Sequence, residues 1–192
     1  MVVGVLSLQG AFIEHINMLN KISGVKPIQI KKKEDLEKID GLIIPGGEST
    51  TIGRLLERHE LLTPLRKMIF EGFPVFGTCA GFILLSKKIE NNNEQPILGI
   101  LDVTIKRNAF GTQINSMEID LKIKDFEIPY KAVFIRAPVV KKLGNGVEVL
   151  AEVDEGPVFI RQGNILGASF HPELTDDIRI HQMFIDIINK RR

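Results

Sequence analysis

The stretch PVFGTCAGFILL, residues 74–85, contains the only cysteine of this 192-residue chain. Three apolar or turn-forming residues come before the segment GTCAG and four apolar residues follow it, which is typical of a strand that turns sharply into a helix. The flanking glycines, Gly77 and Gly81, are needed where strand and helix approach too closely for a Cβ atom. Cys79 is then held at an exposed tip, above a helix N-terminus that favours the thiolate. The pattern predicts a nucleophile rather than a buried cysteine that acts as a small hydrophobe.

The sequence before this turn predicts a parallel sheet. Short β-branched runs alternate with longer amphipathic stretches from residue 2 to residue 76, which is the pattern of a sheet wrapped by helices. The run GLII, residues 41–44, is apolar without alternation, as expected for a strand covered on both faces. The carboxyl ends of such strands are where a site is expected.

The sequence after residue 97 has a different pattern of apolar and turn-forming residues. Short strand-like runs are broken by turn residues, which predicts antiparallel or mixed sheet, with tight turns at residues 144–146 and 162–164. Apolar residues at helical spacing predict a last helix at residues 175–189. Asp176 and Asp177 are expected in its first turn, where they would complement the helix dipole.

Composition limits the classes of function. Hydrophobic residues make up 44% of the chain and charged residues 26%, and the formal net charge is +1, so no polyanionic partner such as a nucleic acid is expected. The basic clusters at residues 31–33 and 190–192 are interpreted as solvated surface. The first apolar run, residues 1–8, is too short to span a membrane and lacks a signal-peptide pattern. A single cysteine is compatible with the cytoplasm, and no Cys/His cluster suggests a metal.

His171 is the histidine best placed to act as the base that a cysteine nucleophile needs. It lies in FHPE, residues 170–173, where the following proline forces it out of the helical region. In an extended segment Glu173 points the same way and can orient one imidazole nitrogen while the other faces the thiol. A turn leading into a helix explains this segment equally well when it is taken alone. The other histidines are expected to be surface or partly packed residues: His15, His59 and His181.

The order of these residues disfavours a generic esterase. In α/β-hydrolases the acid precedes the histidine on a separate segment, whereas Glu173 follows His171 by two residues.

A third segment, PGGESTT at residues 45–51, has glycines that allow backbone N–H groups to approach a tetrahedral oxyanion. The alternative is a strand-to-helix turn with Ser49 or Thr50 as N-cap. The phosphate-loop pattern is absent.

Taken together, the cysteine turn, the HPE segment and the glycine loop resemble those of class I (triad) glutamine amidotransferases. Four segments narrow the resemblance to the glutaminase subunits of pyridoxal 5'-phosphate synthases: LQG (8–10), PGGESTT (45–51), RNAFG (107–111) and FIRAP (134–138). The resemblance spans essentially the whole chain. It implies an α/β fold with a three-layer, mixed but mostly parallel sheet flanked by helices, of the flavodoxin-like kind. It also implies one glutaminase domain, residues 1–192.

The resemblance implies a role for each site residue. Cys79 would attack the side-chain amide of L-glutamine and form a thioester, His171 would transfer protons, and Glu173 would orient His171. The backbone N–H groups of Gly47 and Ala80 would donate to the oxyanion. The implied glutamine-binding residues are Gly46, Gly47, Glu48, Arg107, Ile135 and Arg136. No cofactor and no metal are implied.

The two arginines, Arg107 and Arg136, also suit glutamine on chemical grounds. A guanidinium group matches the geometry of an α-carboxylate, although either arginine alone could equally form a surface or interface salt bridge. Members of the family often have an arginine where this chain has Thr112, so Thr112 is left out of the predicted site.

The resemblance further implies a partner protein. It also implies hydrolase and lyase chemistry for this chain. Ammonia would pass along a protected path to a separate synthase subunit in a hetero-oligomer, which combines it with a pentose phosphate and a triose phosphate. All 192 residues are used by the glutaminase, so no acceptor domain remains. We expect the synthase to act near Gln9 and Gly10 and to arrange the oxyanion loop, so that the isolated chain is a poor glutaminase.

Three other interpretations remain open at this point. The chain could supply ammonia to another synthase, such as imidazole glycerol phosphate synthase, or it could be a γ-glutamyl hydrolase that acts without a partner. A redox or stress sensor also has a cysteine at a strand-to-helix turn, but it would not need His171 and Glu173.

Overall fold

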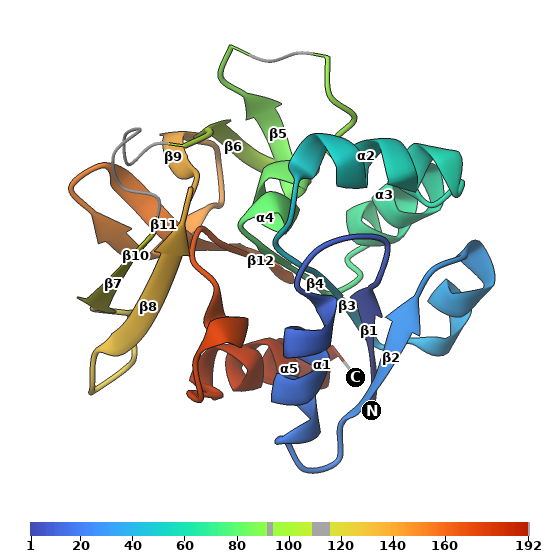
Figure 1. The fold of residues 1–192 in the computed structure, drawn as a ribbon, viewed down its shortest axis with the longest axis horizontal. Coiled ribbons are helices and arrows are strands. Elements are labelled where there is room, and N and C mark those ends of the chain that lie inside the picture. Colours follow the sequence, from blue (N-terminus) through green and yellow to red (C-terminus); the bar gives the residue numbers. More distant parts are fainter. Residues whose placement is uncertain (92–93, 109–115, 192) are drawn as a thin grey trace.

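The computed structural model describes residues 1–91, 94–108 and 116–191. Its centre is a seven-stranded sheet with the spatial order β10-β11-β12-β4-β3-β1-β2 (Figure 1). The parallel strands are β12 (Ile165–Ala168), β4 (Val75–Thr78), β3 (Gly41–Ile44), β1 (Val2–Leu6) and β2 (Lys26–Ile30). At one edge, two antiparallel strands continue the sheet: β11 (Gly156–Gln162) and β10 (Glu148–Val153). The prediction of a mixed but mostly parallel sheet is confirmed.

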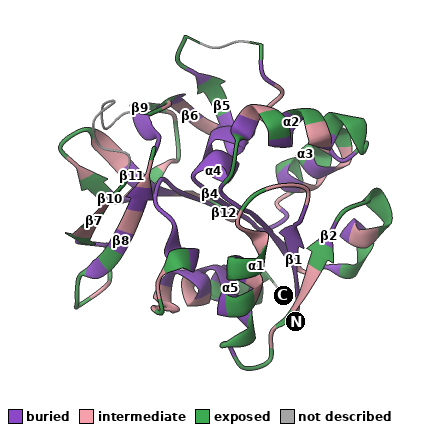
Figure 2. Ribbon diagram, viewed as in Figure 1, coloured by how far each residue is buried: buried purple, intermediate pink, exposed green. Residues whose placement is uncertain are grey.

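Helices cover both faces of this sheet (Figure 1). One face carries α1 (Phe12–Asn20) and α5 (Arg179–Arg191), and the other carries α2 (Ser49–Arg58), α3 (Leu62–Phe70) and α4 (Ala80–Leu85). Successive strand residues point to opposite faces, so Phe76 packs with α1 and α5 while Val75 packs with the other three helices. The central strands and α4 are buried throughout, as Figure 2 shows. Burial on both faces explains why the strand sequences are apolar without alternation.

Two smaller sheets flank the centre. One consists of β5 (Ser86–Ile89), β6 (Leu101–Lys106) and β9 (Val139–Leu143), and the other is the hairpin of β7 (Ser116–Leu121) and β8 (Tyr130–Ile135). The short 3₁₀ helices are η1 (Lys33–Lys38) and η2 (Pro172–Leu174). The turn predicted at residues 162–164 joins the paired strands β11 and β12, whereas the turn at residues 144–146 joins strands of different sheets. In the described part of the chain, no helix is long and apolar enough to cross a membrane.

The last helix begins four residues later than predicted. Asp176 and Asp177 precede α5 and do not form its first turn. Asp177 Oδ1 accepts a hydrogen bond from the backbone N–H of Arg179 at 3.0 Å, and this contact competes with a helical conformation at Asp177. The apolar residues at helical spacing begin only at Ile180, so nothing in the sequence required a helix before that residue.

Candidate active site

The turn around Cys79 connects β4 to α4 at the carboxyl end of the sheet. Cys79 has φ 46° and ψ −100°, a conformation that residues with a Cβ atom rarely adopt. A Cβ atom on Gly77 would lie 2.6 Å from the carbonyl carbon of Gly81, and one on Gly81 would lie 2.0 Å from the carbonyl oxygen of Ile44. Both glycines are therefore required by close approach, as the sequence predicted.

His171 and Glu173 follow strand β12, which is the neighbour of β4 in the sheet, and His171 lies beside Cys79. His171 Nδ1 lies 2.7 Å from Glu173 Oε1, and His171 and Cys79 line the same cavity. His171 has φ −108° and ψ 85°, outside the helical region, and its N–H donates to Val133 O at 2.8 Å. The structure therefore brings the three predicted catalytic side chains together.

The charges of His171 and Glu173 follow from the contacts of these two side chains. Burial alone would lower the pKa of His171, but its hydrogen bonds with Cys79 and Glu173 and their charges raise that pKa to about 10. Burial alone would raise the pKa of Glu173, but the neighbouring imidazoles of His15 and His171, the latter hydrogen-bonded to the carboxylate, hold that pKa below its usual value. His171 is thus a cation and Glu173 a carboxylate at neutral pH.

The glycine loop after β3, residues 45–51, lies against His171 and Cys79. A Cβ atom on Gly46 would lie 2.5 Å from His171 Cε1 and 3.5 Å from Cys79 Cβ. The loop is held from its other side by the segment after β1. Ala11 N donates to Gly46 O at 3.0 Å, and Glu48 N donates to the side-chain oxygen of Gln9 at 2.9 Å. The predicted site of partner action, Gln9 and Gly10, is thus in direct contact with the loop.

Glu48, rather than Ser49 or Thr50, caps the N-terminus of α2. Its carboxylate accepts hydrogen bonds from Thr50 N at 3.1 Å and Thr51 N at 2.7 Å, and it lies 3.3 Å from Arg107 Nη2. Burial would raise the pKa of Glu48, but the hydrogen bonds from Thr51 and Thr50 lower it to about 2. The interpretation of this segment as a simple Ser or Thr cap is therefore wrong, because the glutamate side chain reaches the same donors.

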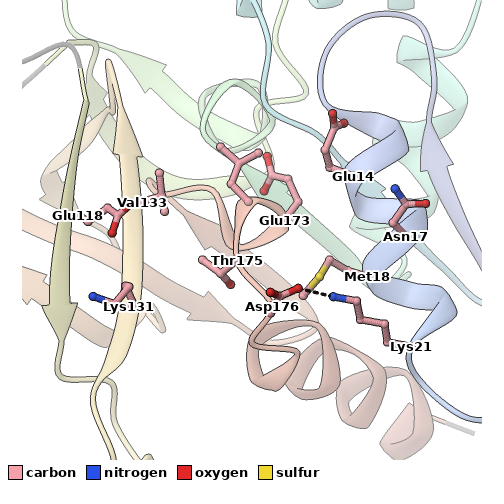
Figure 3. Close-up of a pocket in the computed structure, with 11 residues that line it drawn as sticks. Glu14, Asn17, Met18, Lys21, Glu118, Lys131, Val133, Glu173, Thr175 and Asp176 are labelled. Carbon is pink, nitrogen blue, oxygen red and sulfur yellow. Dashed lines mark hydrogen bonds and ion pairs between the residues drawn. The ribbon is translucent and has the colours of Figure 1, made fainter.

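One cavity of about 410 Å³ and one of about 400 Å³ lie near these residues. The cavity of about 400 Å³ is lined by every predicted site residue except Glu173: Gly46, Gly47, Glu48, Cys79, Ala80, Arg107, Ile135, Arg136 and His171. The cavity of about 410 Å³ lies between α1, the β7–β8 hairpin and η2 (Figure 3), and Glu173 is the only predicted site residue on its wall. Residues 109–111 of the RNAFG segment and Thr112 fall outside the described residues.

The prediction for His15 and His181 is wrong, because both are fully buried. His15 lies on the same face of α1 as Met18 and Leu19, and His181 lies on the same face of α5 as Phe184 and Ile185. That spacing was visible in the sequence and would have placed both histidines in the core. His59, in contrast, is exposed.

Gln95 is a site residue that the sequence did not indicate. Its buried side-chain oxygen accepts hydrogen bonds from Ser49 Oγ at 3.3 Å, Thr50 Oγ1 at 3.2 Å and Arg107 Nη1 at 3.2 Å. It therefore joins the start of α2 to the arginine of the cavity. Gln95 lies in a polar loop with no periodic pattern, so no local signal marked it. Within residues 1–91, 94–108 and 116–191, no group of three or more His, Cys, Asp or Glu residues is arranged to hold a metal.

Comparison with known proteins gives full-length matches. The model of the SNO glutamine amidotransferase family matches residues 5–190. Pyridoxal 5'-phosphate synthase subunit PdxT of Carboxydothermus hydrogenoformans is 53% identical over 191 residues, covering 99% of each chain. The subunit of the same name from Kosmotoga olearia is 49% identical over 192 residues, covering 99% of this chain and all of the relative.

Solved structures agree with these matches. A crystal structure of a glutamine amidotransferase superposes with a TM-score of 0.93 at 48% identity, covering 98% of this chain and 100% of the other. PurLQS from Thermotoga maritima has a TM-score of 0.67 at 18% identity, covering 96% and 97% of the two chains, and shares the fold alone. The expectation of lyase chemistry is wrong, because the matched family consists of glutamine amidotransferases, which cleave an amide with water.

Proposed function

Because the chain belongs to the SNO glutamine amidotransferase family, we propose that it hydrolyses L-glutamine through a thioester on Cys79 and passes the ammonia to a pyridoxal 5'-phosphate synthase subunit. The observation that supports this proposal most directly is the meeting of a strained cysteine, a histidine and a carboxylate beside a glycine loop. We propose that all 192 residues form one glutaminase domain. Its location in the cytoplasm stays a prediction from the lone cysteine.

The first half-reaction forms the thioester. Cys79 Sγ, having given its proton to His171, attacks the side-chain carbonyl carbon of glutamine, and the amide oxygen becomes an oxyanion. Ala80 N–H lies in the first turn of α4, where helix N–H groups lack an intrahelical acceptor, and it can donate to this oxygen. Gly47 N–H is the second proposed donor. His171 then protonates the amide nitrogen, the C–N bond breaks, and ammonia leaves.

The second half-reaction consumes water. Neutral His171 takes a proton from a water molecule, whose oxygen attacks the thioester carbon, and the C–S bond breaks to give glutamate. Glu173 holds the imidazole in the required orientation and stabilises its charged form through the 2.7 Å contact with Nδ1. The same histidine therefore acts as acid in one step and as base in the next.

The charged residues of the cavity suit the α-amino acid end of glutamine. Arg107 and Arg136 can bind its α-carboxylate, and Glu48, which is ionised, can bind its α-ammonium group. Gln95 keeps Arg107 in place through a 3.2 Å hydrogen bond. Ile135 contributes its carbonyl oxygen, which lies 3.8 Å from Cys79 Sγ and borders the reacting centre.

The proposed partner is the ammonia-accepting synthase subunit, in a hetero-oligomer. A glutaminase for imidazole glycerol phosphate synthase is not favoured, because relatives that are 49% and 53% identical over almost the whole chain are named as pyridoxal 5'-phosphate synthase subunits. We propose that the partner acts through Gln9 and Gly10, whose contacts with the glycine loop would let docking adjust the oxyanion donor.

The test is ammonia release from glutamine by wild type and by Cys79→Ala, each with and without the synthase subunit. We expect rapid release only from wild type with the synthase. Equal release by both proteins would refute the role of Cys79, and equal release with and without the synthase would refute the role of the partner. Rapid cleavage of γ-glutamyl peptides by the chain alone would favour a stand-alone γ-glutamyl hydrolase.

A further inference from the structure

We propose that His15 is a positioning residue that holds the second carboxylate oxygen of Glu173 and thereby fixes the orientation of His171. This inference rests on the proposed glutaminase function. The reacting atoms lie on the other side of Glu173, since His15 is not among the residues that line the cavity of Cys79. His15 would therefore act through Glu173 and not on glutamine itself.

The two oxygens of Glu173 face two different imidazoles. His171 Nδ1 lies 2.7 Å from Oε1, and His15 Nε2 lies 3.4 Å from Oε2. The side chains of His15 and Glu173 are both completely inaccessible to solvent. Among the described residues, Glu173 Oε2 has no hydrogen-bond partner, and His15 Nε2 is the ring nitrogen that faces it.

The position of the proton on His15 follows from its neighbours. Burial lowers the pKa of His15 and lowers that of His181 well below its usual value, so both rings are neutral. A proton on His15 Nδ1 would leave the lone pair of Nε2 facing a carboxylate, which is unfavourable. The proton is therefore on Nε2, and Nδ1 accepts from His181 Nε2 at 2.9 Å. With its proton on Nε2, His15 also donates a hydrogen bond to Thr78 Oγ1 at 3.1 Å.

The elements that carry these residues are also joined elsewhere. Figure 3 shows α1 and η2 facing each other across the cavity that Glu173 borders, with Glu173 on the η2 side. Lys21 at the end of α1 forms an ion pair of 2.9 Å with Asp176, just after η2. This ion pair is exposed and contributes little, but α1 also packs into the core through the buried Leu19. Loss of the His15 contact is therefore expected to free the carboxylate without separating the two elements.

Three substitutions separate the contact from the bulk of the side chain. His15→Gln keeps an amide N–H near the position of Nε2, His15→Asn places one near Nδ1, and His15→Leu removes both. Each would be assayed with the synthase subunit for kcat and KM of glutamine hydrolysis. We expect kcat to fall about 10- to 100-fold in the Leu and Asn variants, as for other residues that orient a functional histidine, with KM within about two-fold of wild type. His15→Gln should retain kcat within about three-fold of wild type.

A matched control comes from the same helix. Leu19→Ala opens a cavity under α1, one turn beyond His15, without touching Glu173. At an equal loss of thermal stability it should leave kcat close to wild type. If His15→Leu does not fold, the comparison of His15→Gln with His15→Asn decides, because the two amides replace different imidazole nitrogens and differ otherwise by a single methylene group.

Several results would overturn the inference. Equal kcat in the Gln and Asn variants, wild-type kcat in the Asn variant, or an equal loss in Leu19→Ala would show that His15 serves only packing. If wild type with the synthase released no ammonia, the proposed function itself would fail, and the inference with it. Normal release by wild type with no effect of His15→Asn would overturn the inference alone.

Discussion

The turn around Cys79 and the glycine loop at residues 45–51 both follow parallel strands of one sheet, but they are held by different kinds of contact. The cysteine turn is packed against main chain: a Cβ atom on Gly81 would lie 2.0 Å from Ile44 O, and Cys79 N donates to Ala168 O at 2.8 Å. These contacts belong to the sheet itself. They cannot change without disturbing the core.

The glycine loop is held in part by the segment after β1. With that segment it forms one backbone hydrogen bond, from Ala11 N to Gly46 O, and one hydrogen bond from Glu48 N to the side chain of Gln9. Gln9 is half-buried and Gly10 is exposed, so a partner can reach both. The comparison indicates that the nucleophile is held in place by the fold, whereas the oxyanion donor of the glycine loop, Gly47, is adjustable.

The largest effect is expected from Gly81→Ala. The added methyl group would meet backbone atoms that cannot move aside, so we expect a loss of at least about 3 kcal/mol in the free energy of unfolding and no glutamine hydrolysis. That loss corresponds to a fall of about 6–12 °C in Tm. Gly163→Ala is the control, since Gly163 has φ +58° and open space, and only the cost of a left-handed conformation, about 1 kcal/mol, is expected. Similar losses in the two variants would contradict the role of close packing.

Gly10→Ala tests the adjustable loop in the same way. Gly10 has φ +103°, and a Cβ atom there would lie 1.9 Å from Gly46 O. We expect the loop to be displaced and hydrolysis with the synthase to fall about 10²- to 10³-fold, as when one oxyanion donor is lost. The change in Tm should be smaller than for Gly81→Ala, because Gly10 is exposed. Gly24→Ala, at φ +77° with open space, should retain activity. Unchanged activity in Gly10→Ala would show that the loop does not depend on this segment.

His171, which lies beside the fixed cysteine turn, should make the free energy of unfolding depend on pH. Its pKa is raised to about 10 in the folded chain, so its contribution is complete below the ordinary value of 6.5 and is lost as the pH rises towards 10. Urea unfolding of wild type and His171→Gln from pH 6 to pH 9 should show the advantage of wild type falling by at most about 1.4 kcal/mol per pH unit. Glu173, with a lowered pKa, acts in the opposite range, below 4.5. An advantage that grows with pH would show that His171 is neutral in the folded chain.

The sequence predicted the fixed region better than the adjustable one. Glycine spacing around Cys79 and the proline after His171 are local signals, and the structure confirms the sharp turn and the contact between His171 and Glu173. The prediction of an exposed Cys79 is wrong, because the surrounding loops bury this residue to 8% exposure.

The cap by Glu48 is local, because its carboxylate binds Thr50 N and Thr51 N within three residues. The contacts of Gln95 with Ser49 and of His15 with Glu173 depend on segments far apart in the chain. No local pattern specifies which loops meet, although helical spacing could have placed His15 in the core.

Gln9→Ala is expected to have the smallest effect and is the most specific test of the adjustable loop. It removes the acceptor of Glu48 N, at 2.9 Å, while leaving the backbone hydrogen bond from Ala11 in place. One such hydrogen bond contributes about 1 kcal/mol, which corresponds to about a five-fold fall in synthase-stimulated kcat. Gln9→Glu keeps an acceptor oxygen and should lose less. If both variants lost only activity measured without the synthase, Gln9 would support the resting loop and not its response to the partner, and the division between a fixed and an adjustable region would have to be drawn elsewhere.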